Sequence, residues 1–473
     1  MMEIQAESTV STGVRYPALP PLLAEPFRVR NLGKYLQYFG AGALLAGMTI
    51  GSGEVVATPR LGSYLGATVG WVLLLAVITK FLFPFLIGRH VVLTGQHVMD
   101  ALAKQKWFHV LCIIVTIIGF GAFWAGMSGL VGISLQWLTG VGTPTMWAFI
   151  TTGVVFVMMQ LGSFAFMEKV QIVCSIYMTL AAIATLLAVN PDWVVAVSSL
   201  VPSALEYPDW LGGVAPEIVN TPVTFEVLGA FGLIGGGFME YLAYGSWATE
   251  KGWGLTDRPT VDMPKLDTSP DNVRTGLKWL NPVKIDVTSG FVLIGLTAIS
   301  FYLVGVFLLY PDHLVPSGFD LVQHQASYLA ETSTLMLWVF KVAIVIVFAT
   351  TLYGWLDGLP RAYRMAFRPL MPNFVDRIRQ RKWHLFWQLE LISVGSIWML
   401  MNLNPAQLML FAGQLSNVIL PAVFLWMAIF PLQRVLTGPL RLRGAMKVFA
   451  LVVAILFTVF AVISAWSIYT AIS

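Results

Sequence analysis

Long apolar runs recur along the whole of this 473-residue chain, and they restrict what it can fold into. Each is about 20 residues long, enough for a helix to cross the roughly 30 Å hydrocarbon core of a bilayer. Only 11% of the residues are charged, whereas soluble proteins carry about 25%. The runs do not alternate between polar and apolar residues, as the strands of a membrane barrel would. The sequence therefore predicts an all-α integral membrane protein.

The basic residues indicate how the predicted helices are oriented. The long loops 191–223 and 311–333 contain acidic residues but no Lys or Arg. Nearly all Lys and Arg residues lie in the loops on the opposite side of the membrane. We therefore expect those loops and the N-terminus in the cytoplasm, and the C-terminus outside. We therefore expect a multi-pass protein of the cell or inner membrane. Its eleven predicted helices lie near residues 36–60, 69–94, 108–138, 144–163, 169–190, 224–248, 286–310, 334–358, 384–402, 405–431 and 445–471.

Glycines interrupt two of these segments, which lie five helices apart. The first segment contains Gly40–Thr58, with five glycines and then Glu54. The sixth runs from Gly229 through three consecutive glycines to Glu240. Glycine is a poor helix former, so both helices are expected to break inside the membrane. Because five helices make an odd number of crossings, the second half would be inverted, which is typical of transporters with a central binding site.

The two glutamates are the leading candidates for binding a substrate. Charges inside hydrocarbon are costly and usually functional. Glu54 and Glu240, with carbonyl groups freed around Gly51 and Gly236, would form an oxygen-rich site suited to Mg²⁺, Ca²⁺ or Mn²⁺. Met239 would add a soft thioether, although a methionine in a membrane helix is more often a packing residue. The structural alternative is that each glutamate pairs with a lysine or caps a helix.

Other polar residues within the apolar segments have two interpretations each. Lys80 is either the counter-ion of a glutamate or a fixed charge that replaces a coupling cation, and we expect a salt bridge. Lys341 is expected to extend toward the membrane surface, and Arg60 to lie at an interface. Gln414 and Asn417 either line the transport pathway or form hydrogen bonds between helices.

The sequence lacks the residues that several classes of function require. All six histidines fall at segment ends or in loops, and the third segment contains no Asp or Glu. The sequence therefore provides no chain of titratable residues for a proton relay through the membrane. No phosphate-binding loop, HExxH or GxSxG motif occurs, which argues against an enzyme and against a cofactor.

These residues resemble the Nramp family of divalent-metal transporters over most of the chain. The family's Asp-Pro-Gly-Asn motif falls on Gly51–Glu54, and its Met-Pro-His motif falls on Met239–Tyr241, after a similar Gly232–Gly235. Arg89–Gly95 and the pair Glu168-Lys169 are also similar to family segments.

The sequence departs from the family pattern at the positions that bind metal and protons in the family. The metal-binding Asp is replaced by Gly51, the Asn by Glu54 and the proton-linked His by Tyr241, and the acids of the third helix are missing. The chain looks most like the Nramp-related magnesium transporters, although that branch tends to lose the methionine found here as Met239. The resemblance implies that Tyr241 borders the pathway.

Together these arguments predict a LeuT-type 5+5 inverted repeat with one extra helix, which carries Mg²⁺ and/or Mn²⁺ by alternating access without proton coupling. The alternatives are a proton-coupled Mn²⁺/Fe²⁺ symporter, an organic-solute symporter on the same fold, and a membrane enzyme or sensor. The oligomeric state stays open. The expected parts are a cytoplasmic tail (1–34), a first repeat (35–190), an extracytoplasmic loop (191–223), a second repeat (224–431), and a cytoplasmic loop with the eleventh helix (432–473).

Overall fold

The structure, a computed structural model, describes residues 13–25, 29–51, 53–315, 326, 334–401, 405–436 and 438–472. Parts of the predicted N-terminal tail and of the predicted outer loop 311–333 lie outside these residues. Within the described part the chain is helical, and pairing between extended segments is limited to two isolated β-bridges. The predicted all-α fold class is confirmed.

Nine helices in the described residues are long and apolar enough to span a membrane, or ten if one bent pair is counted as a span. The ninth of the eleven predicted segments, 384–402, corresponds to α21 (Gln380–Leu400), which is not among these ten. The remaining long elements are α3 (Ala41–Thr49) with η3 (Gly53–Ala57) and α4 (Thr58–Leu65), α5 (Gly70–Lys80), α6 (Leu82–Thr94), α8 (Lys106–Thr139), α9 (Pro144–Leu161), α10 (Phe164–Ala188), α14 (Val223–Leu233), α15 (Phe238–Glu250), α17 (Leu280–Val304), α19 (Thr334–Phe367), α22 (Pro405–Gln414) with η7 (Leu415–Ile419) and α23 (Leu420–Ile429), and α25 (Gly444–Ile472).

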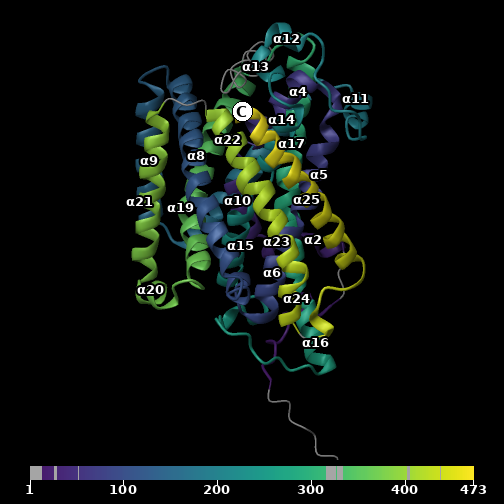
Figure 1. The fold of residues 1–473 in the computed structure, drawn as a ribbon, viewed down its shortest axis with the longest axis vertical. Coiled ribbons are helices and arrows are strands. Elements are labelled where there is room, and N and C mark those ends of the chain that lie inside the picture. The colour runs from purple at the N-terminus through teal and green to yellow at the C-terminus, as the bar shows by residue number, and fades with distance from the viewer. Residues whose placement is uncertain are drawn as a thin grey trace, which may run out of the picture.

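The connecting segments divide between the two ends of the bundle (Figure 1). One end carries the short helices of the predicted outer loop, and the C-terminal end of the chain lies there too. The opposite end carries the short helices of the basic loops. This division agrees with the orientation expected from the basic residues. The short helices are α11 (Trp193–Ser198), α12 (Leu211–Val214) and α13 (Pro216–Val219) at the first end, and α16 (Pro270–Lys278), α20 (Pro372–Arg377) and α24 (Pro431–Val435) at the second.

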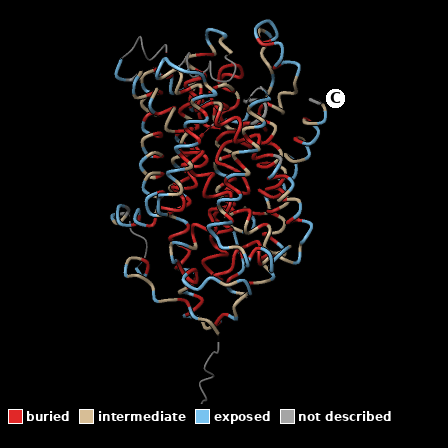
Figure 2. The backbone as a smooth tube through the Cα atoms, turned by 90° about the vertical axis from the view of Figure 1, so that its left-hand side faces the viewer, coloured by how far each residue is buried: buried red, intermediate tan, exposed pale blue. Residues whose placement is uncertain are grey.

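The two glycine-interrupted helices lie at the centre of the bundle. The most apolar stretch of the span through α14 and α15 is entirely buried, whereas only 17% of the corresponding stretch of α9 and 28% of that of α25 are buried. Figure 2 shows the same gradient, with buried backbone in the middle and exposed backbone on the outer helices. The outer helices expose valine, isoleucine and leucine side chains, as lipid-facing helices do. A site at the breaks therefore lies deep inside the bundle.

The start of α3 is held by α17. The backbone N–H groups of Gly40 and Gly42 donate to the Asp286 carboxylate, at 2.8 Å each. A helix N-terminus has unpaired N–H groups and favours a negative charge, so this buried carboxylate stabilises the end of α3. The contact fixes the first half-helix against the surrounding scaffold.

Candidate functional site

The first break separates α3 from α4. The helix ends at Thr49, Ile50 adopts an extended ψ of 101°, and the chain resumes at Gly53 as a turn of π-helix. The two halves are bent by 46°. Ser52 lies outside the described residues. The predicted interruption of this helix is confirmed.

The second break separates α14 from α15. Leu233 ends the first half, Ile234 is extended, and Gly235 and Gly236 have φ of 70° and 80°. Such left-handed conformations are freely available only to glycine, which explains the run of glycines in the sequence. The second predicted interruption is confirmed as well.

Each glutamate accepts a hydrogen bond from the backbone of a glycine three residues earlier. Gly51 N–H donates to Glu54 Oε2 at 3.1 Å. Gly237 N–H donates to Glu240 Oε2 in the same way, so that Glu240 caps the first turn of α15. The repeated arrangement fits two structurally related halves.

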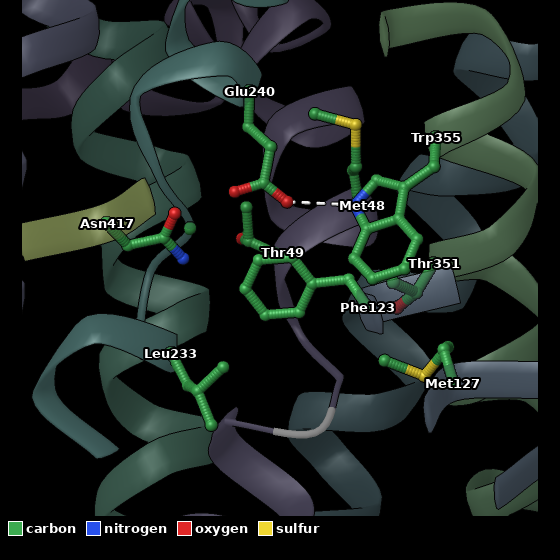
Figure 3. Close-up of a pocket in the computed structure, with 10 residues that line it drawn as sticks. Met48, Thr49, Phe123, Met127, Leu233, Glu240, Thr351, Trp355 and Asn417 are labelled. Carbon is green, nitrogen blue, oxygen red and sulfur yellow. Dashed lines mark hydrogen bonds between the residues drawn. The ribbon is translucent and has the colours of Figure 1, made fainter. Parts of the chain in front are cut away.

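The second oxygen of each glutamate has a different partner. Glu54 Oε1 accepts from the backbone N–H of Gly235 at 2.9 Å, so Glu54 links the first break to the second. Glu240 Oε1 accepts from the indole N–H of Trp355 in α19 at 2.8 Å (Figure 3). Both carboxylates are buried, but only Glu240 lines the central cavity.

That cavity has a volume of about 20 Å³ and lies between the two breaks, α8, α19 and η7. Glu240 is the one charged side chain among its lining residues. Asn417 also faces it, and its buried Oδ1 has no hydrogen-bond partner within the described part of the chain. The lining residues are Met48, Thr49, Phe123, Met127, Leu233, Gly236, Glu240, Thr351, Trp355 and Asn417 (Figure 3).

Several of the predicted site residues lie beside this cavity without lining it. The Tyr241 hydroxyl donates to the carbonyl groups of Gly235 and Gly236, at 3.0 and 2.8 Å. Gln414 Nε2 donates to the carbonyl of Phe225 at 3.2 Å. Met239 is buried but is not a lining residue. Their roles in binding, and those of Glu54, Gly51 and Gly236, stay predictions.

Lys80 differs from its expected role. Its ammonium donates to three backbone carbonyls of the second break. Among the described residues, no carboxylate lies within 4.0 Å of this ammonium as an ion-pair partner. The expected salt bridge is therefore wrong. The ammonium binds these carbonyls instead of a carboxylate, because the break leaves them without helical N–H partners.

Two further basic residues also have partners of their own. Arg60 forms an ion pair with Glu226 of α14, which also accepts from the Tyr64 hydroxyl at 3.0 Å. This links the outer halves of both broken helices. The Lys341 ammonium lies 4.4 Å from the centre of the Trp137 ring, a cation–π contact.

Sequence reasoning missed most of the cavity wall. Met48 and Thr49 directly precede the first break, so position alone could have indicated them. Leu233 likewise directly precedes the second break. The other missed side chains come in pairs four residues apart, Phe123 with Met127 and Thr351 with Trp355. Residues at that spacing share a helix face. Nothing in such a pair distinguishes a cavity wall from ordinary packing.

The described residues contain no group of three or more His, Cys, Asp and Glu side chains that could hold a metal ion. The cavity offers instead one carboxylate, the neutral oxygens of Thr49, Thr351 and Asn417, and the thioethers of Met48 and Met127. This donor set can attract one cation through Glu240 and surround it with neutral ligands.

A second cavity, of about 180 Å³, contains the short helix α7 (Val98–Ala101) in its wall. Burial raises the pKa of Asp100 there to about 6, although Arg368, 3.7 Å away, acts in the opposite direction. Arg361 also borders this cavity and pairs with Glu250 at 2.9 Å. None of these charged groups lines the central cavity.

Comparisons with known proteins agree with this fold. The family model described as natural resistance-associated macrophage protein-like (Nramp) matches residues 42–467. A crystal structure of a mutant of the Eremococcus coleocola manganese transporter is similar with a TM-score of 0.66 and 15% identity, over 93% of this chain and 88% of that chain. MhsT in complex with L-phenylalanine has a TM-score of 0.53 and 16% identity, over 90% of this chain and 98% of that chain. At these identities the similarity shows a shared fold, that of LeuT-type transporters. No curated protein sequence matches this chain.

Proposed function

The chain belongs to the Nramp family of divalent-metal transporters, and from this premise we propose that it carries Mn²⁺, and as second candidate Mg²⁺, by alternating access. It is a multi-pass membrane transporter and not an enzyme. The proposal concerns the choice of ion, the residues that bind it, and the driving force.

The observation that carries the proposal is the position of Glu240. Its carboxylate is the one charge that faces the central cavity, in a space enclosed by the two broken helices. Each of its oxygens accepts one donor and retains a further lone pair. A cation in the cavity would contact this carboxylate, and the unpartnered Oδ1 of Asn417 is a second available ligand.

The thioethers favour Mn²⁺ over Mg²⁺. Met48 and Met127 border the cavity, and sulfur ligands suit transition metals better than they suit Mg²⁺. A cavity of about 20 Å³ has room for roughly one water molecule. Because Mg²⁺ gives up its water shell reluctantly, it fits this space poorly.

The same lining supports the proposal of uncoupled transport. Glu240 is the one titratable side chain among the lining residues, and it is also the proposed ion ligand. A divalent cation gains about 4.6 kcal/mol per 100 mV of membrane potential, twice the value for a unit charge. The potential is therefore a sufficient driving force for uptake.

Uptake by proteoliposomes tests the proposal. We expect radioactive Mn²⁺ to enter faster when a potassium gradient and valinomycin make the interior negative, and a pH-sensitive dye inside to stay constant. Acidification that depends on Mn²⁺ would favour the proton-coupled symporter instead. Accumulation of a labelled amino acid without competition from metal would favour an organic-solute symporter.

A further inference from the structure

Lys80 is a fully buried cation at the centre of the molecule. It is the last residue of α5, and its side chain is not exposed to solvent. An unpaired charge in such a place costs several kcal/mol. The residue must therefore have a compensating environment, and its contacts show which groups provide it.

Three backbone carbonyls provide that environment. The Lys80 Nζ atom lies 2.8 Å from the oxygen of Gly232, 2.7 Å from that of Ile234 and 2.9 Å from that of Gly236. An ammonium has three N–H donors, so every donor is used. The ring of Phe231, 5.5 Å from Nζ, adds a cation–π contact.

The break in the helix creates this group of acceptors. Inside a continuous helix, the Gly232 carbonyl would accept from the N–H four residues later. Here α14 ends at Leu233, and Gly235 and Gly236 are left-handed, so carbonyls at alternate positions meet at one point. The C-terminal end of a helix, here that of α14, also carries a partial negative charge, which favours a cation.

The two nearby glutamates do not take part in this contact directly. Glu54 and Glu240 use both of their oxygens on N–H donors, and neither forms an ion pair within 4.0 Å with Lys80. Backbone dipoles, rather than a carboxylate, therefore surround the ammonium. Unwound carbonyls and half-helix ends are the groups that coordinate coupling cations in transporters with broken helices.

We propose that Lys80 is a tethered cation, which fills a monovalent-cation site built from the carbonyls of Gly232, Ile234 and Gly236. The protein then needs no free Na⁺ or K⁺ at this break in order to fold or to transport. Removal of the side chain should expose the carbonyls and turn the tethered site into one that binds a small monovalent cation.

Thermal unfolding of the purified protein tests this without any assumption about the transported substrate. The wild-type protein is expected to have the same Tm in choline, sodium, potassium and ammonium chloride at equal ionic strength. Lys80→Ala should unfold at lower temperature in choline, and sodium or ammonium should raise its Tm saturably, by about 3 °C or more.

Two control variants separate the charge from the bulk of the side chain. Lys80→Met fills the space without a charge, so it should be destabilised and insensitive to the cation. Lys341→Ala removes a lysine that lies over Trp137 rather than on carbonyls, and its Tm should not depend on the cation.

The proposal is overturned if Lys80→Ala is as stable as the wild-type protein, or if no small cation raises its Tm. It is also overturned if sodium stabilises the wild-type protein. Should Lys80→Ala not fold in any salt, the wild-type Tm and Mn²⁺ uptake still decide: equal values in sodium, potassium and choline support the tethered cation. Because the Tm requires no transport, a failed uptake assay would leave this test intact.

Discussion

The two broken helices carry nearly the same sequence signal and use it differently. Each glutamate follows its glycines and accepts from an N–H three residues earlier. Glu54 then turns its other oxygen to Gly235 of the opposite break. Glu240 turns to Trp355 and faces the cavity. One glutamate thus joins the two breaks, whereas the other faces the cavity that we propose holds the ion.

This difference indicates how the first and sixth helices move. Glu54 links their central parts, and Arg60 with Glu226 links their outer halves. Gly53 also lies against the backbone of the other helix, since a Cβ on it would be 2.7 Å from the Leu233 carbonyl. We therefore expect the broken halves to move together during transport, with Glu240 carried along as the ligand.

The largest expected effect is on transport in Glu240→Gln. The variant keeps the size of the side chain but removes the one charge in the cavity wall. Hydrogen bonds to charged groups contribute about 1.5–3 kcal/mol, and 1.4 kcal/mol is a factor of ten, so Mn²⁺ uptake at low concentration should fall on the order of 100-fold. Initial rates in proteoliposomes measure this. Uptake within a factor of three of wild type would remove Glu240 from the site.

A smaller effect, on the Tm, is expected when a glycine in either break is replaced by alanine. Gly236 has φ of 80°, and a Cβ there would meet Thr49 and the Glu240 carboxylate. Gly51 lacks a positive φ, and a Cβ there would lie 2.9 Å from Thr351 Oγ1 and 3.0 Å from Met127 Cε. A left-handed conformation costs a non-glycine residue about 1–2 kcal/mol. Gly236→Ala should therefore lower the Tm more than Gly51→Ala, and equal losses would contradict the backbone argument.

Glu54→Gln should change stability more than binding. The amide oxygen can still accept one of the two N–H groups, from Gly51 or Gly235, but the NH₂ group cannot accept the other. A buried N–H without a partner costs about 1–3 kcal/mol. We expect a lower Tm with an apparent Mn²⁺ affinity close to wild type. The reverse pattern, an unchanged Tm with a lost affinity, would make Glu54 an ion ligand and erase the contrast with Glu240.

The sequence was sufficient to predict the all-α membrane fold and both helix breaks. It was not sufficient for Lys80, because its partners are backbone carbonyls that become available only once the helix has unwound. It also could not separate Glu54 from Glu240, since the oxygen that distinguishes them contacts residues distant in sequence. Asn417 and Gln414 each had two interpretations, lining the pathway or bonding between helices; Asn417 lines the cavity, whereas Gln414 donates to the Phe225 carbonyl of α14.

The smallest effect concerns the methionines, and it sharpens the comparison between cavity wall and packing. Met127 lines the cavity, whereas Met239, next to Glu240 in sequence, is equally buried but does not. Leucine preserves volume and removes sulfur, a change that usually costs less than about 1.5 kcal/mol in packing. Met127→Leu should therefore reduce the preference for Mn²⁺ over Mg²⁺, measured by Mg²⁺ competition with Mn²⁺ uptake, by about 5-fold. Met239→Leu is the matched control and should leave the preference unchanged. A loss of preference in Met239→Leu alone would place the thioether ligand on α15, as the resemblance to the family motif implies.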